Sequence, residues 1–263
     1  MTDSLPVSVL LLARDEAPRL ERLLPLLSFA REVVVVCDPA GCEAERDVAA
    51  RHGARFFTRA FDGFGPQRQF GLEQCTQPWM LWIDADEWPD AALIVSLRSR
   101  LGNAATESAG AAGLRLARRT WFLGRRIRFC GWGTERIVRA GRRDRVRFDD
   151  APVHERLFVE GRIEDVGGML EHHSYASIDE CTRKMTRYAR AGAERAWKEG
   201  RRASSIDVAV RPALRFLRQY VLQLGFLDGV RGLLVCCFSA GQVYLKYATL
   251  WERTRAARGG ADS

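Results

Sequence analysis

The sequence lacks the glycine-rich signatures that bind phosphates through backbone amides. No G-x-G-x-x-G fingerprint and no Walker loop follows its first apolar run, because the turn at residues 13–18 contains no glycine. A nucleotide bound at this turn would have to be held by side chains and a metal ion. Dinucleotide-dependent oxidoreductases and P-loop NTPases are therefore disfavoured.

The chain also lacks a C-x-x-C pair, a signal peptide and a long apolar run. Its seven cysteines are odd in number and scattered, which fits reduced structural thiols better than a secreted disulfide framework. The longest uncharged run, 232–245, is shorter than the roughly 20 residues that a membrane-spanning helix needs. No basic segment precedes an apolar run at the N-terminus, so we expect no signal peptide and a cytoplasmic protein.

Positive charge is abundant instead. The 263 residues carry a formal net charge of +8 and a pI near 9.4, with an ordinary globular composition of 47% hydrophobic and 28% charged residues. Such a balance predicts an anionic partner, whether a nucleic acid, a phosphorylated substrate or an anionic membrane. No signature of an RNA- or DNA-binding module accompanies the charge, so nucleic acid is not expected.

Strand-like and helix-like segments alternate through the first third of the chain. This alternation predicts β-α-β units and an α/β fold with a mostly parallel sheet. The expected strands are 7–12, 33–37, 54–58 and 79–84, and the expected helices are 18–27, 42–52 and 67–75.

Acidic side chains follow three of these strands. Ligands of open parallel sheets bind outside the carboxyl ends of the strands, so the three acidic groups should line one crevice. The three carboxylates of residues 84–87 would also repel one another, and a divalent cation with a phosphate-bearing ligand would relieve this repulsion, since hard cations prefer carboxylate oxygens. The alternative for the first two groups is that they cap helices. The residues are Asp15 with Glu16, Asp38, and Asp84 with Asp86.

The middle of the chain is rich in arginine and aromatic residues. Residues 115–147 could hold a phosphate- or sugar-bearing acceptor through guanidinium groups and ring faces, or could form a solvated basic surface. The histidines of two later polar clusters could bind metal or diphosphate, or could be satisfied hydrogen-bonding groups. From these segments we expect diphosphate or acceptor contacts from Trp132, Arg139, His154 and His172.

The last third is helical, with a basic amphipathic segment at 183–203 and arginines punctuating apolar runs from 208 to 250. Basic amphipathic helices are typical of proteins that lie on anionic membranes. A buried helical hairpin or a homo-oligomer contact is the competing interpretation. We predict a catalytic domain at 1–180 and a helical membrane-surface or oligomer region at 181–263.

Several strings of the sequence resemble a known family. The chain resembles family 2 glycosyltransferases of the GT-A fold, and within them the small bacterial glucosyltransferases of lipopolysaccharide inner-core biosynthesis. The matching strings run over nearly the whole chain, in the family's order. They are 14–16 (RDE), Asp38, 63–69 (GFGPQRQ), 84–87 (DADE), 122–124 (FLG), 130–132 (CGW), 153–155 (VHE) and 225–229 (GFLDG).

The resemblance implies a Rossmann-like sheet flanked by helices, with the C-terminal amphipathic helices as an extension. It implies inverting transfer of a sugar from a nucleotide donor, for which UDP-glucose is the first expectation. The acceptor would be a core sugar of a lipid-linked molecule at the inner face of the cytoplasmic membrane. Asp84 and Asp86 would serve the donor's ribose and diphosphate and a Mg²⁺ or Mn²⁺ ion, with Asp86 the more direct ligand. The remaining donor contacts would be Arg14, Asp15, Glu16, Asp38, Gln67 and Arg68.

The sequence departs from the family pattern at several positions. Asp15 and Gln69 each replace an asparagine, and residues 39–43 (PAGCE) replace the usual S-T-D turn. Glu135 stands where relatives carry Pro-Asp, and this position is the expected general base. A carboxylate one methylene longer can still accept a hydroxyl proton, but with a different reach. Glu155 is the alternative base.

Other functions stay open at this level. Within enzymes, a polyprenyl-phosphate glycosyltransferase would use the same crevice and the same helices. The replaced positions also allow a non-catalytic nucleotide-sugar binder. The net charge allows a basic protein that binds membrane or nucleic acid.

Overall fold

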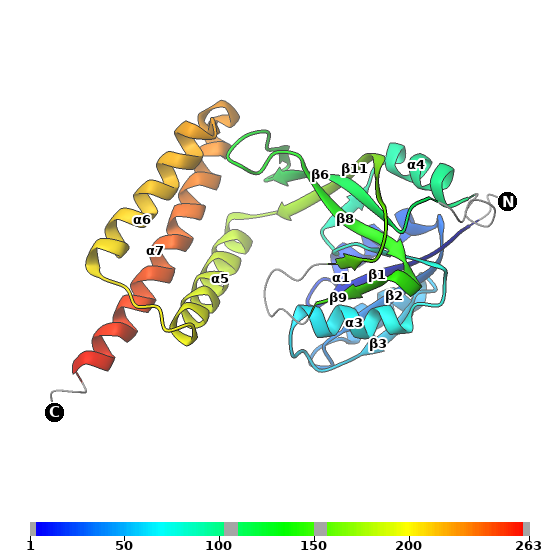
Figure 1. The fold of residues 1–263 in the computed structure, drawn as a ribbon, viewed down its shortest axis with the longest axis horizontal. Coiled ribbons are helices and arrows are strands. Elements are labelled where there is room, and N and C mark those ends of the chain that lie inside the picture. Colours follow the sequence, from blue (N-terminus) through cyan, green and yellow to red (C-terminus); the bar gives the residue numbers. More distant parts are fainter. Residues whose placement is uncertain (1–3, 103–109, 150–156, 260–263) are drawn as a thin grey trace. The chain divides into compact units, whose positions relative to one another are not determined.

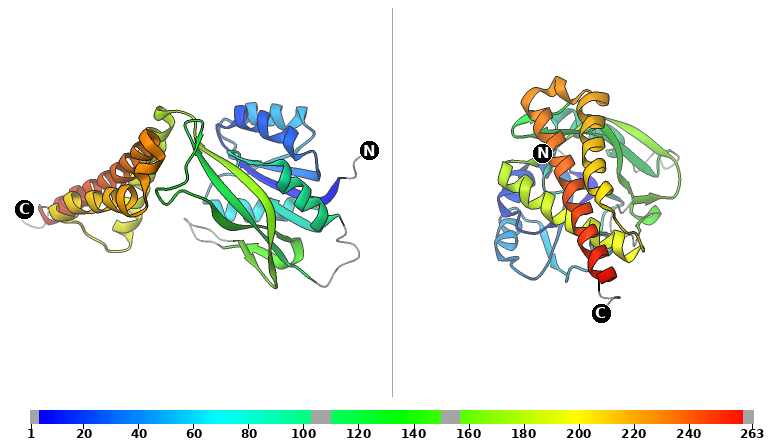
Figure 2. Two further views of the ribbon diagram at one scale, coloured as in Figure 1. Left: turned by 90° about the horizontal axis from the view of Figure 1, so that it is seen from above. Right: turned by 90° about the vertical axis from the view of Figure 1, so that its left-hand side faces the viewer.

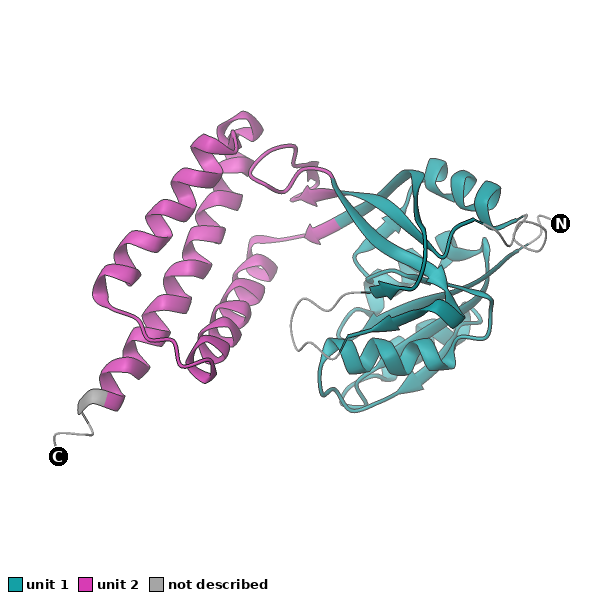
Figure 3. Ribbon diagram, viewed as in Figure 1, with its two compact units in different colours: residues 1–118, 135–172 teal, residues 119–134, 173–263 magenta. Residues whose placement is uncertain are grey.

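The protein was analysed as a computed structural model, which describes residues 4–102, 110–149 and 157–259. Within these ranges, one nine-stranded sheet has the order β3-β2-β1-β4-β8-β6-β11-β5, and β7 pairs with β6 (Figure 1). Chain contacts divide the protein into two compact units (Figure 3). Unit 1 comprises residues 1–118 and 135–172, and unit 2 comprises residues 119–134 and 173–263. The predicted functional division at residue 180 stays a prediction.

The first half of the sheet is parallel. It contains β1 (Leu5–Ala13), β2 (Ala30–Cys37), β3 (Arg55–Thr58) and β4 (Trp79–Trp82). The connecting helices are α1 (Ala17–Leu23), the 3₁₀ turn η1 (Leu24–Leu27), α2 (Glu43–Arg51) and α3 (Phe64–Gln74). The predicted strands and helices are all present. Helix α3 begins three residues before the predicted start at 67, because Gly63 (φ +149°) ends the preceding segment and Pro66 is tolerated in the first turn.

Alternate residues of these strands are buried on opposite faces of the sheet. On one face, Val9 and Leu11 belong to the core cluster that includes the leucines of α1, η1 and α4 (Ala91–Leu101). On the other face, Leu10 and Met80 belong to the cluster with Leu72 of α3. Burial on both faces explains why β1, β2 and β4 are continuous apolar runs and not alternating ones.

The second half of the sheet contains antiparallel pairs, of β4 with β8, of β8 with β6 and of β5 with β11. The parallel pairs join β1, β2, β3 and β4, and the predicted α/β class with a Rossmann-like sheet and flanking helices is confirmed. The strands are β5 (Glu87–Pro89), β6 (Gly113–Phe122), β7 (Arg125–Arg126), β8 (Glu135–Arg142) and β11 (Ile163–Tyr175). The short turn η2 (Arg143–Arg145) leads to the separate ribbon of β9 (Val146–Phe148) and β10 (Leu157–Val159).

Unit 2 is built mainly from α5 (Ile178–Lys198), α6 (Ser205–Leu217) and α7 (Gly229–Gly259), with η3 (Arg218–Leu222) and η4 (Gly225–Asp228) between the last two. Helix α7 packs against both α5 and α6 (Figures 1 and 2). The predicted amphipathic segment at 183–203 is not helical to its end. Helix α5 ends at Lys198, because Gly200 takes a left-handed conformation (φ +77°) that favours helix termination.

In the described part of the chain, one helical stretch, Gly225–Ala257, is long and apolar enough to cross a membrane, judged by length and composition alone. The core helices of soluble proteins can have the same length and composition. Only 17% of its most apolar 18-residue window is buried, so the interior of unit 2 does not account for its apolar character.

Candidate functional site

The acidic groups that follow β1, β2 and β4 lie at one edge of the sheet, because these strands are parallel neighbours. Two predicted donor contacts are paired there, with Arg14 Nη1 3.6 Å from Asp38 Oδ2. Asp38 also accepts a hydrogen bond from the amide of Ala40, which closes a turn just beyond β2. A role in donor binding stays a prediction for both residues.

The turn after β1 is fixed by contacts of its own. Asp15 has a left-handed backbone (φ +56°), and 85% of its side chain is exposed. The amide of Glu16 donates to the buried carboxylate of Glu45 (2.8 Å), while the Glu16 carboxylate pairs with Arg19 (2.9 Å). These contacts form the start of α1 without a glycine, as the sequence requires.

Gln67 and Arg68 are neighbours in α3 but have different surroundings. The buried amide of Gln67 exchanges hydrogen bonds with Arg59, accepting from its guanidinium and donating to its carbonyl oxygen (3.1 Å each). It therefore holds the connection between β3 and α3. Arg68 is also buried, and its guanidinium carbon lies 3.8 Å from the centroid of the Trp82 ring.

Trp82, the last residue of β4, stacks with two cations. The guanidinium carbon of Arg139, from β8, also lies 3.8 Å from the ring centroid. Cation–π contacts of desolvated guanidinium groups are worth about 2 kcal/mol each. The indole thus separates two like charges and holds both beside Asp84.

The carboxylates of Asp84 and Glu87 neutralise these cations. Asp84 accepts from Arg68 (3.1 Å), from Arg139 (2.9 Å) and from the Trp82 indole N–H (3.0 Å). Burial alone would raise the pKa of Asp84, but the positive charges of Arg139 and Arg68 hold it well below its ordinary value of 3.8. Both oxygens of Asp84 are therefore occupied by side chains of the protein.

Glu87 is the centre of this cluster and has no exposed surface. It accepts from Arg118 (2.8 Å), from Arg139 and from the backbone N–H of Asp84 (3.1 Å). Arg118, on β6, in turn pairs with Glu135. We define the buried-charge cluster as Arg68, Asp84, Glu87, Arg118, Glu135 and Arg139.

The expected base, Glu135, is the exposed end of the cluster. It lies directly across from Arg118 in the β6–β8 register, which explains their ion pair. About half of its side chain is exposed (49%), in contrast to Glu87. The arrangement orients a carboxylate from inside the protein while leaving it accessible to a substrate.

Asp86 is paired differently from Asp84. His172 lies opposite Glu87 in the β5–β11 register, and its Nε2 is 3.6 Å from Asp86 Oδ2. An imidazole nitrogen and a carboxylate oxygen at this separation could share one divalent cation. Among the described residues, no group of three or more His, Cys, Asp or Glu side chains is arranged to hold a metal. Further ligands would have to come from substrate or water.

The other predicted residues divide into two groups. Trp132 lies in unit 2, where it stacks with Tyr175 (ring centroids 6.1 Å apart). His154 and Glu155 lie outside the described residues. Sequence reasoning assigned no individual role to Trp82 or Arg118, and it counted Glu87 only among the three carboxylates that would need a positive partner. The signal for Glu87 was present, because a glutamate that continues a buried strand requires cationic partners.

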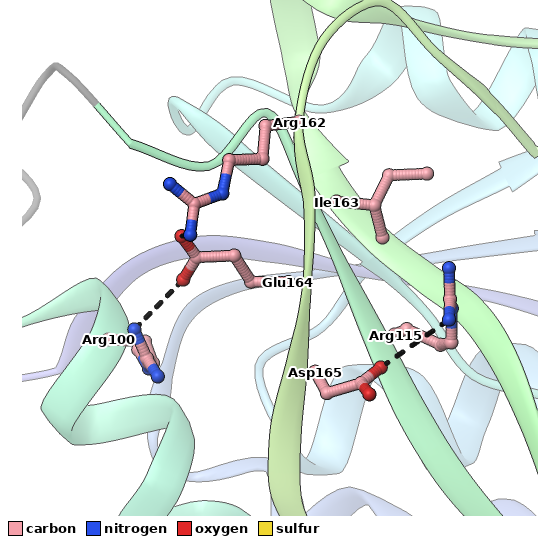
Figure 4. Close-up of a pocket in the computed structure, with 6 residues that line it drawn as sticks. All are labelled: Arg100, Arg115, Arg162, Ile163, Glu164 and Asp165. Atoms are coloured by element: carbon pink, nitrogen blue, oxygen red, sulfur yellow. Dashed lines mark hydrogen bonds and ion pairs between the residues drawn. The ribbon is translucent and has the colours of Figure 1, made fainter.

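A separate shallow pocket of about 400 Å³ lies in unit 1. Its ion pairs join Arg100 to Glu164 (2.9 Å) and Arg115 to Asp165 (3.8 Å) (Figure 4). None of the predicted site residues lines it. The lining residues are Arg100, Arg115, Arg162, Ile163, Glu164 and Asp165.

Comparison with known proteins finds related glycosyltransferases. Residues 8–153 match the model of "Glycosyl transferase family 2". The chain is 28% identical to the lipopolysaccharide core biosynthesis glycosyltransferase LpsC of Rhizobium meliloti, over 94% of this chain and 95% of the relative. It is 21% identical to an uncharacterized glycosyltransferase of Rickettsia typhi, over 96% of this chain and 89% of the relative.

Among solved structures, TarS (1–349) of S. aureus is 13% identical to the chain. The alignment covers 97% of this chain and 91% of TarS, with a TM-score of 0.42. The score is too low for conclusions about shared detail. The family match and the sheet topology together confirm the predicted GT-A fold.

Proposed function

Because this chain belongs to glycosyl transferase family 2, we propose that it is an inverting glycosyltransferase that moves glucose from UDP-glucose to a sugar of a lipopolysaccharide core or similar lipid-linked acceptor. One observation carries the proposal. The edge of the sheet where β1, β2 and β4 end bears Asp38 and the buried-charge cluster, with Asp86 and His172 beside it. The match to LpsC over most of both chains supports the acceptor class.

In this proposal the donor nucleotide lies along the carboxyl edge of the sheet. Glu16 and Asp38 would contact the nucleoside, and their positions after the neighbouring strands β1 and β2 support this role. Arg14, Asp15, Gln67 and Arg68 would line the same donor crevice. Asp84 would support the site indirectly. Its oxygens already accept from Arg68 and Arg139, and these bonds fix the segment that carries Asp86.

A Mg²⁺ or Mn²⁺ ion fits beside Asp86 and His172. Such ions commonly take one or two protein ligands and complete their shell with substrate phosphates and water. When bound, the ion would neutralise charge that develops on the leaving diphosphate. The pair Asp86–His172 supplies one oxygen and one nitrogen ligand.

Glu135 performs the proton transfer. Its carboxylate takes the proton of the acceptor hydroxyl, and the hydroxyl oxygen attacks the anomeric carbon from the face opposite the diphosphate. The new glycosidic bond forms as the bond to the diphosphate breaks, so UDP leaves and the configuration inverts. Arg118 is the positioning residue, because it holds Glu135 through a hydrogen bond and is itself anchored on Glu87.

The test is transfer to a defined acceptor. Purified protein, UDP-sugars and core oligosaccharide are combined with and without Mn²⁺, and released UDP and the product's anomeric configuration are measured. Metal-dependent UDP release with an inverted product supports the proposal. Transfer only to polyprenyl phosphate would replace the acceptor class, and donor binding without transfer to any acceptor would refute the enzymatic role.

A further inference from the structure

The apolar surface of unit 2 is concentrated in one segment. Among the described residues, eleven of the nineteen exposed large apolar side chains fall between Ile206 and Leu233. Soluble monomers normally expose such residues singly, and contiguous patches mark binding surfaces. The segment covers α6, η3, η4 and the first turns of α7.

The patch begins as a stripe along α6. Residues spaced three or four apart lie on one face of a helix, so the four exposed large apolar side chains of α6 form a continuous row. Helix α6 packs on α7, and the stripe remains exposed. Its members are Ile206, Val210, Leu214 and Leu217.

The turn between α6 and α7 continues this stripe with its most exposed residues. Leu222 is 78% exposed and Val230 is 72% exposed, with Leu227 at 55% between them. We define the apolar tip as residues 221–230. The tip is part of a fixed structure and not a frayed end, as its hydrogen bonds show.

Three hydrogen bonds hold the tip, and a fourth holds the adjacent Gln219 of η3, to residues 123–133 of the same unit. Asp228 accepts from the backbone N–H groups of Arg128 (3.1 Å) and Phe129 (2.8 Å). Cys130 N–H donates to the carbonyl of Gln223 (3.0 Å), and the buried Gln219 amide donates to the carbonyl of Cys130 (2.9 Å). The protein therefore maintains exposed leucines in a rigid turn.

Arginines lie on the segments next to the apolar tip, and the acidic residues of this region form hydrogen bonds within the protein. Asp228 accepts backbone N–H groups, and Asp207 caps α6 and pairs with Arg211 (2.6 Å). Five arginines near the tip are exposed, two of them on α6 and η3 and three within residues 123–133, the segment that binds the tip. They are Arg215, Arg218, Arg125, Arg126 and Arg128, all exposed.

We propose that the apolar tip, with the α6 stripe, inserts into an anionic phospholipid bilayer while these arginines bind lipid phosphates. An apolar surface with arginines beside it matches the boundary between acyl chains and anionic headgroups. A protein partner would need acidic groups around an apolar recess, whereas any anionic bilayer supplies both. The inference deepens the proposed function, since a lipid-linked acceptor lies at such a surface.

The test is flotation of the full-length protein with vesicles of phosphatidylcholine, with and without phosphatidylglycerol, and without donor or acceptor. Wild type is expected to float with anionic vesicles. The double variant L222E/L227E should bind at least tenfold more weakly, because two exposed leucines lose their apolar burial. V95E, an equally exposed valine on α4 of unit 1 (66%), is the matched control and should float like wild type.

A second variant tests the arginines. R125Q/R126Q should lose about fivefold per arginine on anionic vesicles and nothing on neutral ones, because each arginine near an anionic surface contributes about that factor. Equal flotation of wild type and L222E/L227E would overturn the inference. So would a dimer that L222E/L227E converts to a monomer in light scattering without any vesicle binding, since the surface would then join two copies of the chain.

Flotation tests the membrane surface and sugar transfer tests the proposed function, so the two proposals can fail independently. L222E/L227E should transfer sugar to a soluble core oligosaccharide at the wild-type rate and lose rate only on vesicle-embedded acceptor. Vesicle binding by a protein that transfers no sugar would leave the membrane surface standing and refute the proposed function. If wild type and L222E/L227E are both released from membranes only by detergent, the tip does not insert and the inference is overturned.

Discussion

Replacing Glu87 by glutamine tests whether the buried-charge cluster organises unit 1. Glu87 has no exposed surface, and its carboxylate accepts from two arginines and from the amide of Asp84. The cluster contains three carboxylates and three guanidinium groups and is therefore neutral. The substitution preserves the shape of the side chain but leaves one positive charge without compensation.

The expected loss is about 3 kcal/mol of unfolding free energy, at the lower end of the roughly 3–5 kcal/mol for breaking a buried ion pair. The lower end applies because the glutamine oxygen, in the place of Oε1, can still accept from both Arg118 and Arg139. Its NH₂ group would then face the backbone N–H of Asp84, which loses its acceptor. For a protein of ordinary stability, about 5–15 kcal/mol, this is a large fraction.

The assay is urea unfolding followed by hydrogen exchange of peptides from β4 and β8. Two compact units need not unfold in one transition, so a local probe of unit 1 is required. The matched control is E199Q, which removes an exposed carboxylate paired with Arg195 on α5 and should change nothing measurable. A loss below about 1 kcal/mol for E87Q, the range of surface pairs, would refute the reasoning.

Three further predictions concern the site. E135Q should abolish transfer while wild-type binding of UDP-sugar is kept, measured by turnover and by thermal shift; undiminished turnover would reassign the base to Glu155. D86N should remove the Mn²⁺-dependent part of the UDP thermal shift and H172A should weaken it; an unchanged shift would refute the metal site. D84N should destabilise the protein at neutral pH. The difference in unfolding free energy between D84N and wild type should shrink as pH falls below 3.8 toward the lower folded-state pKa of Asp84, because protonation of Asp84 removes its ion pairs in wild type too. A pH-independent difference would contradict this.

The sequence predicted the parallel half of the sheet because its signals are local. Apolar runs of strand length that alternate with helix-like segments are sufficient to place β1 to β4 and the acidic edge. The antiparallel half was not predicted strand by strand. The arginines of β6 and β8 resemble a solvated surface in sequence, although Arg139 is buried in the structure.

The partners within the site could not be predicted because they are set by register between distant strands. Arg118 meets Glu135 across the β6–β8 pair, and His172 meets Glu87 across the β5–β11 pair. No local pattern specifies which residues of two strands will face each other. The strings that resemble the family named Asp84 and Asp86 together, but only the register separates their surroundings.

This separation assigns different work to the carboxylates that follow β4. Asp84 and Glu87 satisfy buried arginines, and the Asp84 amide donates to Glu87, so the turn between them is closed on itself. Asp86 lies within that closed turn, and its carboxylate points instead toward His172 on β11. The turn therefore directs one carboxylate toward His172, where the proposed function would have it meet the metal and donor, while two others hold the turn in place. A rigid support of this kind is what a transition state requires, because charges fixed before the reaction need no reorganisation during it.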